Sequence, residues 1–482
     1  MTNLNYVGPR EGPTDPEGVT GRLCDWLANF TLEAAPAEAR ARARDLVLDG
    51  LGCALVGAQL PWSRTAVEAM ARFEGSGPAR LIGWGRALPA PAAVLLNGTF
   101  IQGFELDDFH PLGPLHSASV LLPALLAVSD LQGGVSGAAF LRAMLAGLEV
   151  GPRVGMALHG AQMLSRGWHS GSVFGTHAAA AATGVLLRLD AARFEDALGL
   201  AGTQSGGLMA AQYEAMCKRM HHGFAARAGF SAACLAAGGY TGIKRVFERD
   251  YGGFLSVFGE GHDPRAELIV DGLGERWEVL RIAIKPYAAM GALHAPLDAL
   301  FRIAARRPLR ADNIAAIDVY MSHAAYHHGW WELERPITPI AAQMNVGYAL
   351  AVATLDGAAM VRQFSPARID GDDIWALIPR IKAHHETRFD AGEARGGTRL
   401  VIRFTDGSSE EEQVRAARGI VAPLASAEVE AKFRTLTNGI IAPERRDAIV
   451  RLVADLENLP DVAALSALVA PQAASPFEIA AG

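Results

Sequence analysis

The sequence predicts a mainly α-helical protein, in which a large helical domain built from both ends of the chain carries a smaller inserted α/β domain. Helical periodicity rich in alanine, leucine and glycine dominates residues 17–282. Strand-like segments occur between residues 283 and 415, and helical periodicity with charged outer faces returns from 416 to 482. Residues 1–16 are expected to form a loose N-terminal arm.

The predicted helices and strands follow from local patterns. Helices are expected at Pro36–Val56, Phe174–Leu189, Ala225–Ala237, Ser426–Leu436 and Pro443–Leu456. Strands are expected at Ile314–Met321 and Thr398–Phe404, and the Asp406-Gly407 pair after the second strand indicates a hairpin turn. The many small side chains of the two middle helices should allow close helix packing in the core.

Length and composition limit the classes of protein. A chain of 482 residues is too long for one simple core, which favours two domains or more. A net charge of −7 argues against a broad nucleic-acid surface, and no apolar run reaches the length of about twenty residues that spans a bilayer. Four widely spaced cysteines without a CxxC pair fit a reducing compartment. We expect a cytoplasmic protein without nucleic-acid or membrane partners.

The densest polar cluster combines carboxylates and imidazoles next to an apolar run. It contains Glu105, Asp107, Asp108, His110 and His116. Buried charges are costly unless they are paired, so the cluster is either a satisfied ion-pair network or a proton-transfer site. Aspartate and histidine also bind metals, but no second ligand group at a recognisable spacing accompanies them, and we predict no metal site.

Two further motifs place basic groups at helix starts. His169 lies among glycines before an alanine-rich helix, where backbone amides attract anions, although a simple turn histidine fits the pattern equally. Lys218 and His221 are three residues apart and would share one helix face. Cations are unfavourable at a helix N-terminus, so a bound anion would resolve the conflict there.

Two other candidates are weaker on residues alone. Lys285, followed by His294, falls at the predicted boundary between the domains, where clefts commonly form, but it could equally be a surface lysine in a linker. Tyr348 enters an apolar helix and, on its pattern alone, is a core residue with a satisfied hydroxyl.

Together these groups suggest chemistry on a small molecule with several carboxylates. Abstraction of a proton next to a carboxylate needs a positioned base and fixed positive charge, which histidine, lysine and arginine supply. The sequence contains no GxGxxG opening a βαβ unit, no GxxxxGK[ST], no HExxH and no GxSxG. Nicotinamide, ATP, zinc-protease and α/β-hydrolase chemistry are therefore disfavoured, and we expect no cofactor.

Several ordered motifs resemble the MmgE/PrpD family, which includes 2-methylcitrate dehydratase, cis-aconitate decarboxylase and iminodisuccinate epimerase. The matching stretches are Gly103–Pro123, Gly167–Asp190, Lys218–Gly229, Lys285–Asp298, Gln343–Ala351 and Ala431–Leu468. The resemblance implies an all-helical domain with an inserted α/β lid, a homodimer, no obligatory cofactor, and an active site between helical domain and lid.

The resemblance also implies the site residues. The catalytic set would be His116, His169, Lys218, Tyr348 and Asp107, and the substrate-binding set Asp108, His221, Lys285 and Glu105. Either His116 or His169 would be the acid or base, Tyr348 would assist proton transfer, and the two aspartates would orient the imidazoles.

Three departures from the family pattern affect the choice of reaction. Glu105 stands where aspartate is common, Phe109 where threonine is usual, and Met290 near the place of a further histidine found in decarboxylases. These changes weigh against decarboxylation. We therefore rank dehydration of a 2-methylcitrate-like compound first, with epimerisation of an iminodisuccinate-like compound or a cis-aconitate-type decarboxylation as alternatives. A non-catalytic scaffold that binds carboxylates is the competing class.

Overall fold

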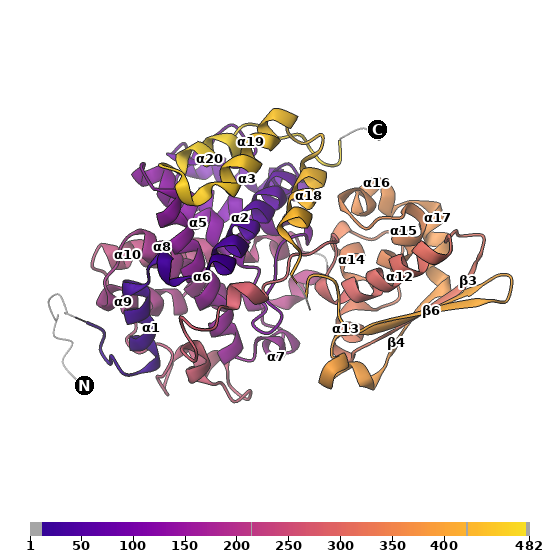
Figure 1. Cartoon of the computed structure of the whole chain (residues 1–482), viewed down its shortest axis with the longest axis horizontal. Helices are drawn as coiled ribbons and strands as arrows, with labels where there is room; N and C mark the ends of the chain where they lie inside the picture. Colours follow the sequence, from indigo (N-terminus) through magenta and orange to yellow (C-terminus); the bar gives the residue numbers. More distant parts are fainter. Residues whose placement is uncertain (1–11, 214, 421–422, 479–482) are drawn as a thin grey trace.

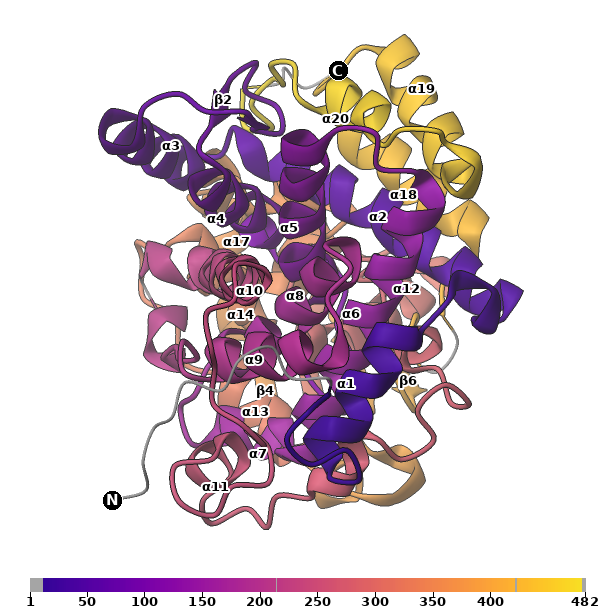
Figure 2. The same cartoon turned by 90° about the vertical axis from the view of Figure 1, so that its left-hand side faces the viewer.

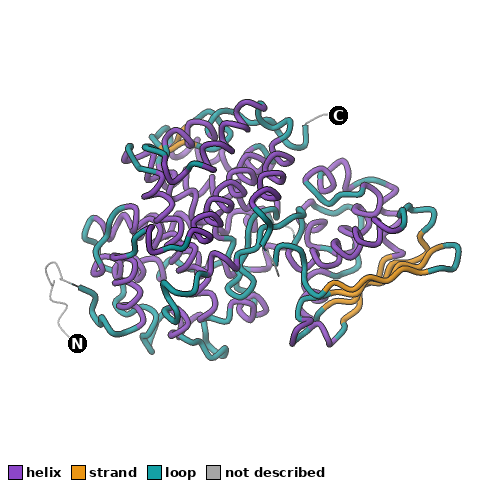
Figure 3. The backbone as a smooth tube through the Cα atoms, in the orientation of Figure 1, coloured by secondary structure: helices purple, strands orange, loops and turns teal. Residues whose placement is uncertain are grey.

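The computed structural model describes residues 12–213, 215–420 and 423–478 of a mainly α-helical protein. Figure 1 shows a larger helical body, with the last helices of the chain packed on it, beside a smaller part that contains a four-stranded sheet. Helices dominate both parts, and almost all strand residues lie in that one sheet (Figure 3). The prediction of a mainly α-helical fold is confirmed.

The larger body contains fourteen α-helices among the described residues. They are α1 (Val19–Asn29), α2 (Ala37–Ala58), α3 (Pro61–Glu74), α4 (Ala90–Ile101), α5 (Ser117–Gln132), α6 (Gly137–Ala157), α7 (Gly160–Ser165), α8 (Ser170–Leu186), α9 (Ala191–Gly202), α10 (His221–Ala237), α11 (Phe254–Phe258), α18 (Ser426–Thr437), α19 (Pro443–Ala454) and α20 (Ala463–Val469). A short hairpin, β1 (Ala79–Arg80) with β2 (Ala87–Leu88), joins α3 to α4.

Helices α8 and α10 form the centre of this body, and α8 lies between α6 and α10 (Figure 2). Every residue of α8 is buried. A Cβ added to Gly229 of α10 would come within 2.3 Å of the carbonyl oxygen of Thr176 in α8. The backbones of α8 and α10 are therefore in close contact, as the small side chains of both helices led us to predict.

Both central helices begin four residues earlier than predicted, at Ser170 instead of Phe174 and at His221 instead of Ala225. The first residues of both helices are mostly serine, glycine and histidine, which have lower helix propensity than alanine, and the pattern therefore placed each start too late. Tertiary packing extends the helices through these polar residues. As a result, two predicted site histidines lie at helix starts.

The smaller part contains one mixed sheet covered by helices. Its strands are β3 (Ile314–Met321), β4 (Ile381–His385), β5 (Thr398–Phe404) and β6 (Ser409–Val414), in the spatial order β4-β3-β5-β6. Strands β3 and β4 are parallel, whereas β5 pairs antiparallel with both β3 and β6. The bounds of β3 and β5 agree with the prediction.

Six helices accompany this sheet: α12 (His294–Arg306), α13 (His323–Gly329), α14 (Pro339–Met344), α15 (Val346–Asp356), α16 (Pro366–Ile369) and α17 (Asp372–Leu377). Helix α12 packs on β5 and β6, and α15 packs on β4. Helix α14 carries a side chain that reaches the site described below.

The chain returns to the body through α18, which packs along α2. The buried ammonium of Lys432 in α18 lies 2.6 Å from Asp49 of α2 and donates to the carbonyl of Leu106 over 2.6 Å. This contact fixes the C-terminal helices directly beside the acidic loop.

The predicted arm falls mostly outside the described residues, which begin at 12. Within residues 12–16 the backbone is not loose, because Thr14 donates two hydrogen bonds to Glu195 and Asp15 pairs with Arg245 at 3.4 Å. No single described helix is long and apolar enough to cross a membrane; only α2 and α3 together, bent by 81°, meet that length.

Candidate active site

The acidic loop starts where α4 ends. A short 3₁₀ helix, Gln102–Phe104, follows α4, and Glu105 then adopts a left-handed conformation with φ 53° and ψ 38°. This region is uncommon for residues other than glycine, and such backbone conformations concentrate at functional sites. The turn buries the side chains of Glu105, Asp107 and Asp108.

The Glu105 carboxylate is the centre of a buried ion-pair network. It contacts Nζ of Lys218 directly, Nζ of Lys285 at 2.9 Å and the Arg219 guanidinium at 3.4 Å. Burial by itself raises the pKa of Glu105, but the Lys218 and Lys285 charges outweigh it and hold the pKa well below its usual range. The sequence analysis predicted a bound anion next to Lys218. In the structure the Glu105 carboxylate is the negative group that pairs with Lys218 and Arg219.

Asp107 and Asp108 have different partners. Asp107 lies 3.0 Å from Nδ1 of His116 and 3.7 Å from Nζ of Lys285. Asp108 instead accepts hydrogen bonds from the backbone amides of Ser117 and Ala118, the first two residues of α5. The prediction that both aspartates orient imidazoles therefore needs correction for Asp108, because its two oxygens are used to cap α5.

Burial and the neighbouring Asp107 charge raise the pKa of Asp108 to about 7, although the two amide hydrogen bonds oppose this. Burial also raises the pKa of Asp107, but the His116 contact outweighs it and lowers that pKa below its ordinary value. The ionised carboxylate of Asp107 accepts a hydrogen bond from Nδ1–H of His116, which fixes the orientation of this ring.

Four histidines converge beside this loop. The ring of His169, which precedes α8, lies 4.2 Å from the ring of His221 and 5.3 Å from that of His222. The His222 ring in turn lies 4.8 Å from that of His116. Ser172 of α8 donates to the carbonyl of His221 and holds the two helix starts together.

Desolvation favours the neutral forms of His169, His221 and His222, because burial lowers the pKa of each. Burial, followed by the neighbouring His221 charge, lowers the pKa of His169 well below its usual value. Burial and the Lys218 charge lower the pKa of His221 to about 4. Nδ1 of each ring is buried without a hydrogen-bond partner among the described residues. Buried, unpartnered nitrogen atoms at a cation-rich site are suited to binding or transferring a proton of a ligand.

His222 is a site residue that the sequence analysis did not select. Ser119 Oγ donates to the His116 carbonyl over 2.8 Å, so this hydroxyl must accept from Nδ1 of His222, also at 2.8 Å. The proton of neutral His222 is therefore on Nδ1, and its buried Nε2 has no partner among the described residues. The sequence analysis selected the adjacent His221 because its spacing of three residues from Lys218 places both on one helix face.

Gln343 and Arg219 were also missed. The Gln343 amide of α14 donates to the carbonyls of Phe104 (2.7 Å) and Ala288 (2.8 Å) and accepts from Arg219 at 2.5 Å. It therefore connects the helix beside the sheet to the loop that carries Glu105. Gln343 opened one of the family-like stretches, but no feature of an isolated glutamine indicates such a role.

Tyr348 and His294 lie apart from the imidazoles. The Tyr348 hydroxyl donates to the Gln363 carbonyl over 2.7 Å, and no hydrogen bond joins it to the histidine cluster in the described parts of the chain. His294 is buried with Nε2 at 3.0 Å from the Ala289 carbonyl, and burial lowers its pKa to about 3. The structure thus brings together eight of the nine predicted residues and places Tyr348 elsewhere.

A metal site has to be weighed here, because Asp107, His116 and His222 each offer a ligand atom within 4.8 Å of the others. Nζ of Lys285 lies 3.7 Å from Asp107, and the charges of Lys218 and Arg219 are close by. Like charges repel strongly in a low-dielectric interior. The electrostatic environment therefore favours an anion over a divalent cation.

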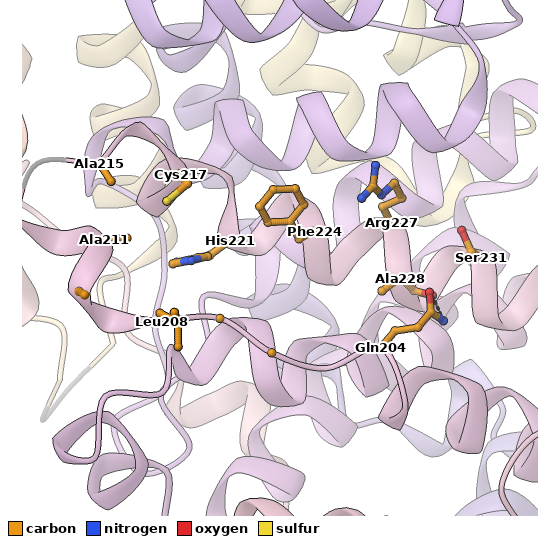
Figure 4. A pocket seen from close by; sticks show the side chains of 13 residues that line it. Gln204, Leu208, Ala211, Ala215, Cys217, His221, Phe224, Arg227, Ala228 and Ser231 are labelled. Carbon is orange, nitrogen blue, oxygen red and sulfur yellow. Dashed lines mark hydrogen bonds between the residues drawn. The ribbon is translucent and has the colours of Figure 1, made fainter. Parts of the chain in front are cut away.

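A pocket of about 680 Å³ opens beside His221, between α10 and the loop 204–211 (Figure 4). Its other walls are largely apolar. His221 lines this pocket, and its ring also lies 4.2 Å from that of His169.

Comparison with known protein families now adds to this geometry. The profile of the MmgE/PrpD N-terminal domain matches residues 21–267, and that of the MmgE/PrpD C-terminal domain matches residues 287–458. The chain belongs to the MmgE/PrpD family. The resemblance read from the motifs is confirmed.

Individual MmgE/PrpD relatives carry decarboxylase names. A cis-aconitate decarboxylase-like protein of Aspergillus oryzae is 43% identical over 94% of this chain and 98% of its own length. A cis-aconitate decarboxylase of Aspergillus terreus is 41% identical over 95% of this chain and 97% of its length. The human cis-aconitate decarboxylase is 24% identical over 91% of each chain.

Proposed function

We propose that this protein is a cofactor-independent lyase that removes CO₂ from a tricarboxylate of the cis-aconitate type. The observation that carries the proposal is the convergence of three buried cations and four imidazoles on one loop. Relatives above 40% identity over nearly the whole chain are named as decarboxylases of this class, or as similar to them. This reverses the order reached from the sequence, where dehydration ranked first.

The charges of the site support binding of an acid. Lys218, Arg219 and Lys285 contribute three positive charges, which the ionised Glu105 and Asp107 offset only in part. A substrate carboxylate would complete the neutralisation and gain charge-assisted hydrogen bonds. The positive groups are already fixed by their contacts, so little reorganisation is needed when the ligand binds.

The reaction needs one bond to break and one proton to be delivered. The carbon–carbon bond to the departing carboxylate breaks, and the carboxylate leaves as CO₂. The electron pair of the broken bond forms a new carbon–carbon double bond in the product. The electrons of the original double bond take up a proton on the carbon next to a remaining carboxylate. Fixed positive charge from Lys218 and Lys285 would stabilise the negative charge that develops on that carboxylate.

The proton would come from the histidine cluster. His116 is partly accessible, with 20% of its side chain exposed, and Asp107 holds its Nδ1–H and would stabilise the charged ring. We therefore assign His116 as the acid: its charged ring would donate the Nε2 proton, while Nδ1–H stays hydrogen-bonded to Asp107. Tyr348 stays a predicted assistant whose hydroxyl would have to leave the Gln363 carbonyl to take part.

The remaining family expectations complete the proposal. Residues 283–415 would act as the lid, because Gln343 and Lys285 both reach the Glu105 loop. A homodimer is expected from the resemblance. Epimerisation, dehydration and a non-catalytic scaffold are the competing outcomes.

One experiment separates these outcomes. The protein is incubated in D₂O with cis-aconitate, 2-methylcitrate and iminodisuccinate, and each mixture is followed by NMR together with CO₂ release. We expect CO₂ and methylidene protons from cis-aconitate. A new alkene from 2-methylcitrate without CO₂ would indicate dehydration, and deuterium uptake without loss of mass would indicate epimerisation. Absence of any reaction, together with a melting temperature that the carboxylates raise, would favour the scaffold.

A further inference from the structure

The turn that carries Glu105 is held on both sides by side chains from distant elements. Glu105 itself adopts the left-handed conformation, with φ 53°. The carbonyl of Phe104, just before it, accepts a hydrogen bond from Gln343 of α14 over 2.7 Å. The carbonyl of Leu106, just after it, accepts one from the ammonium of Lys432 in α18 over 2.6 Å. Strained backbone persists only where its surroundings fix it, and these two contacts flank the strained residue.

Lys432 is a charged donor in a place where a lysine is costly. Its side chain is 6% exposed, and Nζ lies 2.6 Å from Oδ1 of Asp49, whose side chain is 1% exposed. Burial by itself lowers the pKa of Lys432, but nearby groups, chiefly Asp49, outweigh it and raise the pKa above its usual value. The ammonium therefore has two partners, a carboxylate of α2 and a backbone carbonyl of the acidic loop.

The Leu106 carbonyl lies between the two carboxylates that organise the site. Glu105, on one side, is the shared partner of the three buried cations. Asp107, on the other side, accepts from Nδ1–H of His116 over 3.0 Å. A hydrogen bond to the peptide group between two residues limits the rotation of the backbone at both. A displacement of about 1 Å in a catalytic group can lower turnover by about 10²-fold, so this bond bears on the reaction.

The alternative role for Lys432 is purely structural, as an ion pair that joins α18 to α2 through Asp49. That role needs only the contact with Asp49. It requires neither the approach of the ammonium to the acidic loop nor a hydrogen bond there. The bond of 2.6 Å to the Leu106 carbonyl is the observation that a structural ion pair leaves unexplained.

We infer that Lys432 is a positioning residue for the reaction, which acts through the Leu106 carbonyl. By holding this carbonyl it fixes the turn from which Glu105 and Asp107 reach their partners. The inference rests on the proposed function and adds to it a residue from the C-terminal helices. In this role Lys432 acts through the backbone of the acidic loop and needs no contact with the substrate.

Two single variants break the same ion pair but differ in their effect on the loop. Lys432→Met keeps the length of the side chain and removes both the charge and the donor. Asp49→Asn removes the other charge and leaves the ammonium able to donate to Leu106. Both should lower the melting temperature, because each leaves one buried charge without its partner. Below those temperatures, kcat on cis-aconitate should fall about 10–100-fold in Lys432→Met, with KM changed less than about threefold, and stay within about threefold of wild type in Asp49→Asn.

The double variant separates stability from turnover. Lys432→Met combined with Asp49→Asn leaves no unpaired charge from this ion pair, so the melting temperature should rise above that of Lys432→Met. The double variant also takes the place of Lys432→Met if the single variant does not fold. The Leu106 carbonyl still lacks its donor, so kcat should stay as low as in Lys432→Met. Recovery of kcat together with the melting temperature would overturn the inference, as would equal kcat losses in the two single variants.

Hydrogen exchange tests the role of Lys432 apart from the reaction. In Lys432→Met, or in the double variant, the amides of residues 105–108 should exchange at least about tenfold faster than in wild type and in Asp49→Asn. If wild type releases no CO₂ from cis-aconitate but exchange differs in this way, the proposed reaction fails and the hold of Lys432 on the loop stands. If wild type is active and Lys432→Met changes neither exchange nor kcat, the inference fails and the proposed reaction stands.

Discussion

Nζ of Lys285 lies 2.9 Å from Oε2 of Glu105, although the two residues are 180 positions apart in the sequence. The same carboxylate meets Lys218, which lies in a third segment of the chain. One buried acid thus joins the loop after α4, the segment before α10 and the start of the predicted lid. The network fixes the positive charges of the site before any substrate arrives.

Removal of this acid should destabilise the fold. Glu105→Gln keeps the shape of the side chain but removes the carboxylate that three buried cations share, and only Lys285 keeps a second carboxylate within 4 Å, that of Asp107 at 3.7 Å. Loss of one partner from a buried ion pair typically costs about 3–5 kcal/mol, so we expect a free energy of unfolding lower by about that amount in urea titrations. Glu267→Gln, at an exposed pair with Arg22, should change it by less than about 0.5 kcal/mol.

A bound acid should partly replace the missing carboxylate. Citrate in the millimolar range should raise the melting temperature of Glu105→Gln more than that of the wild type. An equal shift in both proteins would mean that ligand carboxylates do not reach Lys218 and Lys285.

Lys218→Ala should affect turnover much more than stability. Glu105 keeps Lys285 and Arg219 as partners in this variant, so the carboxylate remains compensated. Loss of a fixed charge that stabilises developing negative charge should lower kcat by about 10²–10³-fold. Steady-state kinetics on cis-aconitate test this, with the exposed Lys382→Ala as control. A normal kcat in Lys218→Ala would show that Lys218 does not stabilise negative charge in the reaction.

The hydrogen-bond pattern around His222 predicts its tautomer. Nitrogen NMR should show neutral His222 with its proton on Nδ1 and an unprotonated Nε2. Ser119→Ala removes the acceptor of that proton, so the tautomer should become mixed and kcat should fall, because the Ser119 contact to the His116 carbonyl is lost as well. A signal for a protonated Nε2 in the wild type would contradict the assigned network.

Local patterns predicted the strands β3 and β5 and the five helices α2, α8, α10, α18 and α19, because alternation and helical periodicity are properties of neighbouring residues. They also selected eight residues that the fold brings together. They failed at Asp108, whose partners are amides nine and ten residues later, and at Gln343, which acts through three partners in distant segments. Such roles depend on tertiary placement, and the sequence around these residues contains no signal for them.

Acid should destabilise the protein through His221. Its pKa is about 4 in the folded state, whereas an unfolded histidine has a pKa of about 6.5. Between these values the unfolded chain binds a proton that the folded chain does not, so this contribution to stability decreases as pH falls from about 6.5 to 4.

His221→Asn removes this titration. From pH 7 to pH 5, the wild type should lose about 2 kcal/mol more unfolding free energy than the variant. Urea titrations at both pH values measure the difference. Contributions of opposite sign from Asp108 and Glu149, whose pKa values are both raised to about 7 by burial, are present in both proteins and cancel in the comparison. Parallel losses would show that His221 titrates normally in the folded protein.

The Gln343 amide should couple the predicted lid to the acidic loop through its hydrogen bonds. Gln343→Leu fills a similar volume but leaves the Phe104 and Ala288 carbonyls and the Arg219 guanidinium without this partner. Each buried group that loses its hydrogen bond costs about 1–3 kcal/mol, so we expect a stability loss of about 2–4 kcal/mol after partial relaxation. Gln343→Glu should restore the Arg219 contact but not the two carbonyl contacts, and should recover less than half of the loss. Hydrogen exchange should accelerate at residues 103–108 in both variants, because Gln343 holds the carbonyl immediately before Glu105. Unchanged exchange there, with normal kcat, would show that this contact does not couple α14 to the acidic loop.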